Sequence, residues 1–128
     1  MTKQAAMTAE QFATVDDLEA EWFPLPEKLY GKDQGVYIRV MRSDEGSIIE
    51  DKVADRDVPV GEFRRLVLMS TVVDEDDSPI FDAETIAILT ARNRRVVESM
   101  FERACELNGF SKKDVDEIEK NSDGGQSS

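Results

Sequence analysis

Residues 35–41, with the sequence Gly-Val-Tyr-Ile-Arg-Val-Met, form the clearest β-strand pattern in this 128-residue chain. The segment is rich in β-branched and aromatic residues, which are enriched in strands. Successive side chains of a strand point to opposite faces, so the segment divides into two alternating sets. One set is Val36, Ile38 and Val40, and the other is Tyr37, Arg39 and Met41.

The partner of this strand is open to two interpretations. Residues 23–30 can pair with it through a turn at 31–35, and residues 47–53 can pair with it through a turn at 44–46. We favour the first pairing, because Ser43 is a good N-cap for a helix. Residues 47–53 also suit one face of a helix nearly as well as a strand, through Ile48, Ile49 and Val53.

The N-terminal part of the chain contains one helix signal. Thr14-Val-Asp-Asp17 resembles a capping box and predicts a short helix that ends near Trp22. Pro24 and Pro26 then enforce an extended chain. Trp22 and Phe23, beside these prolines, are either an edge of the core or a binding lip, and we favour the core.

The second half of the chain carries most of the helix signals. Pro59 favours the first turn of a helix that ends before residue 74, and Asp82 is expected to cap a short helix. The longest predicted helix covers residues 92–108 and ends at Gly109, a residue type that readily adopts the left-handed conformation after a helix. Ser111 with Asp114 predicts a last short helix.

These signals predict a mainly helical α+β fold in which a short N-terminal β-hairpin is followed by a helical bundle. The length is that of one domain. We divide the chain into a flexible N-terminus at residues 1–13, a single domain at 14–120 and a disordered tail at 121–128. The tail contains no apolar residue, so it can bury nothing that offsets the cost of ordering it.

The composition argues against enzymatic chemistry. The chain has no histidine, the side chain that most often serves as a general acid or base and as a metal ligand. Its one cysteine, Cys105, falls in an apolar helical pattern and is expected to be a buried, inert thiol. We therefore expect a binding protein that is not an enzyme and that has no cofactor and no metal site.

The charge argues against nucleic-acid binding. The net charge is −12, and the acidity is spread along the chain. Residues 1–57 carry 13 acidic and 7 basic side chains, and residues 58–128 carry 15 and 9, so each part has a net charge of −6. A phosphate backbone would be repelled by most of this surface. No apolar run is long enough to cross a membrane, and no signal-peptide core is visible, so we expect a cytosolic protein.

An acidic loop at residues 74–85 partly matches a calcium-binding loop. Asp74, Asp76 and Ser78 occupy the first, third and fifth positions of an EF-hand. The match then fails, because Pro79 stands where a glycine makes the sharp turn and Thr85 stands where a glutamate closes the coordination shell. We therefore expect a solvated loop between helices.

The predicted long helix carries the candidate binding residues. Its wide apolar stripe and the arginines near its start suggest contacts with a partner, and the candidates are Val97, Met100, Phe101, Arg92 and Arg95. The apolar stripe and the arginines can each also have a purely structural role. An apolar stripe of this kind is more often core than interface, and the arginines are able to pair with the abundant acidic side chains.

Several stretches resemble the tail assembly chaperones of long-tailed bacteriophages, the siphophages. Residues 73–81 (Val-Asp-Glu-Asp-Asp-Ser-Pro-Ile-Phe), 107–110 (Leu-Asn-Gly-Phe) and 120–121 (Lys-Asn) are similar in order and spacing to elements of that family. Residues 36–39 (Val-Tyr-Ile-Arg) resemble the "V-Y-V-R" strand of the family. One departure is Asp77, which stands where the family has a loop glycine.

The resemblance implies a function in tail morphogenesis in the host cell cytoplasm. Members of the family bind the tape measure protein, keep it soluble until the tail tube assembles around it, and are absent from the mature virion. In many members a longer form, made by ribosomal frameshifting, recruits the tail tube protein, and this chain would correspond to the short, non-frameshifted form. Several chaperones would coat one partner, so weak self-association is expected as well.

Two other functions compete with the chaperone interpretation. An acidic protein can imitate nucleic acid and inhibit a host DNA-binding enzyme, but Arg92, Arg94, Arg95 and Arg103 interrupt the acidic face of the longest predicted helix. A calcium sensor is disfavoured by Pro79 and Thr85. We therefore favour the chaperone.

The predicted disordered tail can be tested by truncation. A chain that ends at Lys120 is expected to unfold cooperatively with the melting temperature of the full chain, because residues 121–128 have no apolar side chain to bury. Thermal unfolding followed by circular dichroism measures this. Loss of the cooperative transition in the truncated chain would contradict the prediction.

Overall fold

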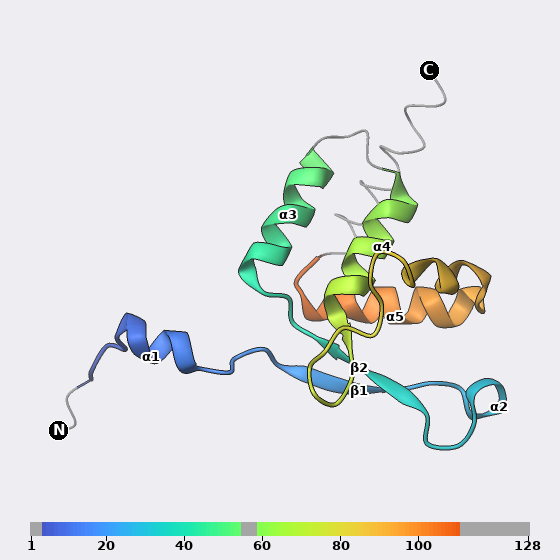
Figure 1. The fold of residues 1–128 in the computed structure, drawn as a ribbon, viewed down its shortest axis with the longest axis horizontal. Coiled ribbons are helices and arrows are strands. Elements are labelled where there is room, and N and C mark those ends of the chain that lie inside the picture. The colour runs from blue at the N-terminus through green and yellow to red at the C-terminus, as the bar shows by residue number, and fades with distance from the viewer. Residues whose placement is uncertain (1–3, 55–58, 111–128) are drawn as a thin grey trace.

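The computed structural model describes residues 4–54 and 59–110 and has the α+β class that the sequence predicts (Figure 1). The elements, in chain order, are α1 (Ala9–Thr14), β1 (Ala20–Pro24), α2 (Glu27–Tyr30), β2 (Gly35–Arg39), α3 (Ser43–Ala54), α4 (Val60–Thr71), β3 (Val72–Val73), the 3-10 helix η1 (Ile86–Ala91) and α5 (Arg94–Leu107).

The strand predicted from residues 35–41 is the central strand of a three-stranded antiparallel sheet with the order β1-β2-β3. Strand β1 pairs with one edge of β2, so that Trp22 lies opposite Tyr37, and β3 pairs with the other edge, so that Val73 lies opposite Tyr37. The favoured partner, residues 23–30, is thus only partly confirmed, because β1 covers Ala20–Pro24 and Glu27–Tyr30 is helical. The alternative pairing is wrong, since residues 47–53 lie in α3.

The predicted order of a hairpin followed by a helical bundle is confirmed only in part. The β1–β2 hairpin does precede the main helices, but the third strand comes from the middle of the helical part of the chain. Strand β3 follows α4 without a loop, because Val72 ends the helix in an extended conformation. The helices therefore pack against a sheet that is completed after α4.

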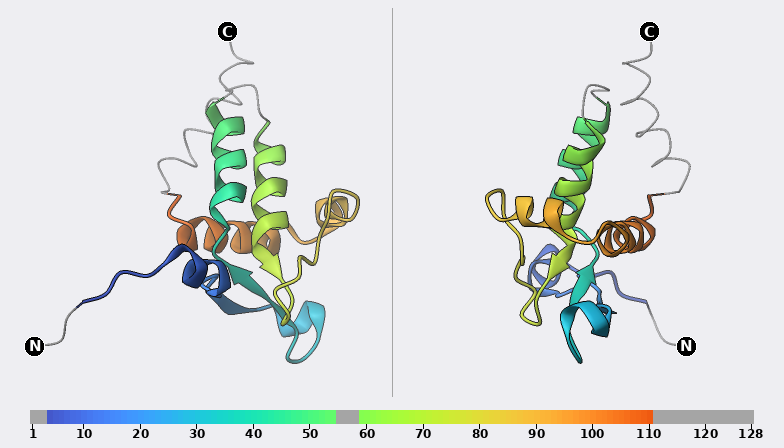
Figure 2. Two further views of the ribbon diagram at one scale, coloured as in Figure 1. Left: turned by 60° about the vertical axis from the view of Figure 1, so that its left-hand side comes forward. Right: turned by 90° about the vertical axis from the view of Figure 1, so that its right-hand side faces the viewer.

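The helix predicted from Thr14 to Trp22 is wrong. The capping box lies at Thr8, whose hydroxyl accepts from the Gln11 amide at 3.2 Å while the Gln11 side chain accepts from the Thr8 amide at 2.8 Å. Helix α1 ends at Thr14, and residues 20–22 are extended because they pair with β2. None of the residues of α1 is buried, and the helix projects from the body of the domain (Figures 1 and 2).

The other helices lie close to their predicted places over the described residues, but the helix expected after Asp82 is a 3-10 helix, and its N-cap is Thr85 instead of Asp82. Pro59 is the N-cap of α4, and Asp82 accepts from the amides of Glu84 and Thr85 just before η1. Helix α5 starts two residues later than predicted, because Asn93 caps it, and Gly109 has a positive φ of 78° after its end. The helix predicted from Ser111 and the tail at 121–128 lie outside the described residues.

A single core joins the helices to one face of the sheet. Helices α3 and α4 lie side by side, and α5 crosses them (Figure 2). The Phe63 ring of α4 packs edge-on against Phe101 of α5, with a centroid distance of 5.5 Å, and against Phe110 at 5.9 Å. The buried cluster consists of Ile38, Met41, Ile49, Phe63, Val67, Leu68, Val72, Ile86, Val96, Met100, Phe101, Ala104 and Cys105.

Substituting alanine for an aromatic residue of this cluster tests how much the domain depends on it. Phe101→Ala should lower the free energy of unfolding by roughly 3–5 kcal/mol, because it removes a buried ring and leaves a cavity. Phe12→Ala is the matched control, since Phe12 is 63% exposed on α1, and its effect should be small. Urea unfolding of both variants measures this, and equal effects would contradict the assigned core.

Candidate binding surface

The candidate residues on α5 divide into buried and exposed groups. Met100 is 4% exposed and Phe101 is 3% exposed, so both belong to the core. Val97 is half-buried, and Arg92 and Arg95 are exposed. Direct contact with a partner is therefore open to Val97, Arg92 and Arg95 in this conformation, and their role in binding stays a prediction.

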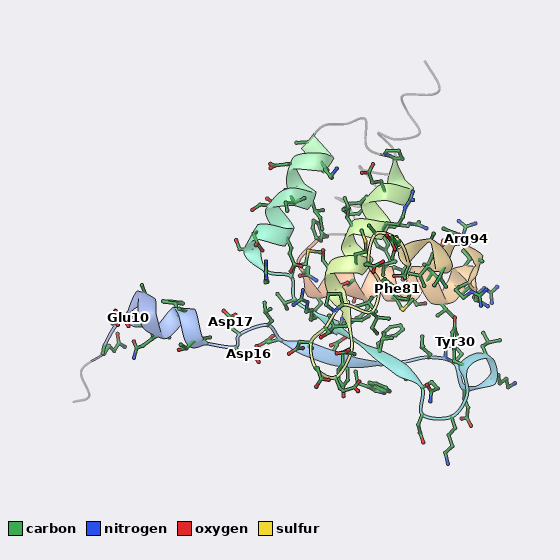
Figure 3. The ribbon with its side chains drawn as sticks, in the orientation of Figure 1. Glu10, Asp16, Asp17, Tyr30, Phe81 and Arg94 are labelled. Carbon is green, nitrogen blue, oxygen red and sulfur yellow. The ribbon has the colours of Figure 1, made fainter. Side chains whose placement is uncertain are left out.

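The arginines near the start of α5 lie in different environments. Arg94 Nε donates to Glu98 Oε1 at 2.8 Å, one helical turn along, and Arg64 of α4 approaches the same oxygen at 3.8 Å. The hydrogen bond from Arg94 lowers the pKa of Glu98, and the two arginines add to this effect electrostatically. Figure 3 shows Arg94 at the outer end of the helix. Arg92 and Arg95, by contrast, form no ion pair with any described residue.

The acidic loop after β3 is held in shape by its own hydrogen bonds. The Asp74 carboxylate accepts from the amides of Asp76 and Ser78 at 2.8 and 3.0 Å. Asp77 has a φ of 63°, so it occupies the left-handed conformation that glycine adopts most readily. The turn thus keeps a glycine-like backbone without glycine. Over residues 4–54 and 59–110, no three histidine, cysteine, aspartate or glutamate side chains are arranged to hold a metal ion.

The Leu-Asn-Gly-Phe stretch at 107–110 fastens the end of α5 to the central strand. Asn108 Oδ1 accepts from the Met41 amide at 2.7 Å, and its Nδ2 donates to the carbonyls of Arg39 and Ala104 at 3.3 and 2.8 Å. One side chain therefore connects the end of β2 with the last turn of α5. The sequence shows the stretch as a helix stop, but it does not show this long-range contact.

An ion pair between β1 and α5 was not predicted from the sequence. Arg103 donates to both carboxylate oxygens of Glu21, and the bond from Nη2 to Oε2 is 2.8 Å long. This hydrogen bonding lowers the pKa of Glu21 and, together with Glu106, raises the pKa of Arg103. The two residues are 82 positions apart, so no spacing in the sequence indicates the pair.

The prediction that Trp22 is a core residue is wrong. Side chains alternate along β1, and Glu21 and Phe23 face the helices, so Trp22 lies on the outer face of the sheet and is 49% exposed. Its ring packs edge-on against Tyr37, with a centroid distance of 5.2 Å. Phe23 is half-buried and packs against the core. Only the assignment of residues 20–24 to a strand shows that the two side chains lie on opposite faces of the sheet.

The described part of the chain has a fold with a three-stranded antiparallel sheet and helices on one face. A search of solved structures finds that this fold is similar to that of the bacteriophage HK97 tail assembly chaperone, with a TM-score of 0.52 and 16% sequence identity. The match covers 77% of this chain and 94% of that chain. At this identity the likeness establishes a shared fold.

No protein-family model matches the chain, and no curated protein matches it. Among the helices of the described residues, none is long and apolar enough to span a membrane.

The pH dependence of stability tests the ion pair between Glu21 and Arg103. Because the folded protein lowers the pKa of Glu21 below its ordinary value of 4.5, the pair stabilises the fold above that pH and loses its effect as the pH falls through the lowered value. Glu21→Gln should therefore be less stable than the natural chain at pH 7, and the difference should shrink towards pH 3. Urea unfolding across this range measures the difference, and a gap that does not change with pH would contradict the assignment.

Proposed function

We propose that this protein is a phage tail assembly chaperone, which binds the tape measure protein and keeps it soluble during tail morphogenesis in the host cytoplasm. The observation that carries the proposal is the fold shared with the HK97 tail assembly chaperone, over 94% of that chain. The sequence motifs that resemble the chaperone family support the same function independently, because they do not depend on the three-dimensional fold.

The positions of these motifs in the fold add to this support. Residues 36–39 lie in the central strand β2, and residues 73–81 start in β3, which pairs with β2 through Val73 and Tyr37. The third motif supplies Asn108, whose side chain bonds to the backbone at the end of β2. Three segments that are distant in sequence therefore meet around one strand, as expected if the resemblance reflects a common fold.

The surface is suited to binding without chemistry. The chain has a net charge of −12, and its exposed apolar side chains are distributed among several elements, such as Phe12, Leu29, Ile48 and Ile88. Charge keeps such a protein soluble while apolar side chains contact a partner. A long helical protein offers repeated apolar faces for such contacts. Several copies are expected to cover one tape measure chain, with weak self-association between them.

Recruitment of the tail tube protein is assigned to a longer form of the chain. In the family that the sequence resembles, a frameshift extends the chaperone at its C-terminus. We expect a frameshift site near the codons for residues 118–128, followed by the reading frame of a long helical protein. The DNA around the coding sequence tests this part of the proposal, and a frame with neither feature counts against it.

Co-expression with the tape measure protein of the same phage tests the chaperone function. The tape measure protein should appear mainly in the soluble fraction with this chain and mainly in the pellet without it. An unrelated acidic protein of similar size and net charge is the control, because it separates specific binding from a general effect of charge. Equal solubility with this chain and with the control would contradict the proposed function.

A further inference from the structure

The outer face of the sheet carries a row of apolar side chains. Trp22 of β1, Tyr37 of β2 and Val73 of β3 are direct partners in the two ladders, so their side chains lie on the same face. Val73 itself is fully buried and forms a bridge with Pro79 of the acidic loop, so the accessible part of the row consists of Trp22 and the half-buried Tyr37. Helices α4 and α5 cover the opposite face, where Ile38 and Val72 are fully buried.

The exposed indole of this row is held in one position. A side chain at Gly35 would place its Cβ 2.5 Å from Cζ2 of Trp22, so the ring lies directly over the Gly35 backbone. Tyr37 contacts the ring edge-on. Trp22 nevertheless remains 49% exposed. A fixed but exposed tryptophan is suited to anchoring a partner, because little conformational entropy is lost when it is covered.

Acidic residues flank the strands that form this face. Strands β1 and β3 are each antiparallel to β2, so they run in the same direction. Asp16, Asp17 and Glu19 precede β1, whereas Asp74, Glu75, Asp76 and Asp77 follow β3, so the two acidic groups lie at opposite ends of the strands. Figure 3 shows Asp16 and Asp17 on the segment that leads into β1. The cation of this face on β2, Arg39, is buried and bonded to Glu45.

We infer that the outer face of the sheet is the docking site for a cationic amphipathic helix of the partner, with Trp22 as its anchor. The apolar stripe of such a helix would cover Trp22 and Tyr37, and its lysine or arginine side chains would reach the acidic groups at the two ends. Charge complementarity therefore selects the occupant. A helix is expected because helices on both faces of a sheet are a stable layer arrangement, and here one face is already covered.

The inference rests on the proposed function, because it assigns the helix to the tape measure protein. The sequence provides the probe, since Trp22 is the only tryptophan of the chain and its fluorescence reports whether the face is covered. The ligands are 30-residue peptides from the tape measure protein, chosen without tryptophan. One set has a cationic amphipathic pattern, and an anionic amphipathic set from the same protein is the control.

The cationic peptides should shift the Trp22 emission to shorter wavelength and protect it from acrylamide, whereas the anionic peptides should do neither. Trp22→Ala should weaken binding, measured by calorimetry, on the order of tenfold or more. Ile88→Ala is the matched control, because Ile88 is 55% exposed on η1, and its dissociation constant should not change. If Trp22→Ala binds as tightly as the natural chain, the docking site is wrong.

The acidic ends of the face are tested by a variant that leaves the apolar row intact. Glu75→Lys with Asp76→Lys should weaken the cationic peptides and make their binding less sensitive to salt. Glu10→Lys with Glu102→Lys changes the net charge equally at exposed positions outside the row and should have a much smaller effect. If the two double variants weaken binding equally, the general charge of the protein is responsible and the inference is wrong.

Two further outcomes separate this inference from its alternatives. Protection of Trp22 that increases with the concentration of the chain alone would show that a second copy occupies the face, and it would overturn the inference. If co-expression keeps the tape measure protein soluble but none of its peptides protects Trp22, the chaperone function stands and the docking site is wrong. If co-expression has no effect but cationic peptides still protect Trp22, the proposed function fails while the cationic docking site stands.

Discussion

The central strand β2 is the constraint on which the rest of the described structure depends. It is hydrogen-bonded on both edges, to β1 and to β3, and Ile38, its fourth residue, is fully buried under the helices. Its end is tied to α5 by the side chain of Asn108 and to the start of α3 by the pair between Arg39 and Glu45. The strands β1 and β3, the start of α3 and the end of α5 are thus all positioned relative to this five-residue strand.

This arrangement makes the two faces of the sheet unequal. One face packs on α4 and α5, and the pair between Glu21 and Arg103 adds a polar contact at its border. The other face leaves Trp22 exposed beside Tyr37. A small domain has only one core to stabilise it, so the apolar stripe of α5 is used within the fold. The candidate surfaces for a partner that remain are the outer sheet face and half-buried positions such as Val97.

The fold and the function rest on different kinds of support. The likeness to the HK97 tail assembly chaperone concerns the arrangement of the elements, and at 16% identity most side chains differ. The stretches that resemble the chaperone family have structural roles in this fold: Asn108 joins two elements, and Asp77, where this chain departs from the family, still provides a left-handed turn residue. The side chains that would select a partner lie elsewhere, and their exposure and charge, not the fold, determine what they can bind.

The sequence was sufficient to predict those element boundaries that depend on neighbouring residues alone. The start of α4 at Pro59, the end of α5 at Gly109 and the strand at residues 35–39 follow from cap geometry, backbone freedom and side-chain alternation. The strand at residues 20–24 could not be predicted in this way, because it forms only where β2 offers hydrogen bonds. This pairing also decides that Trp22 faces outward. Only the tertiary structure could show which apolar residues of α5 are buried, since a stripe on a helix looks the same whether it packs against its own domain or against a partner.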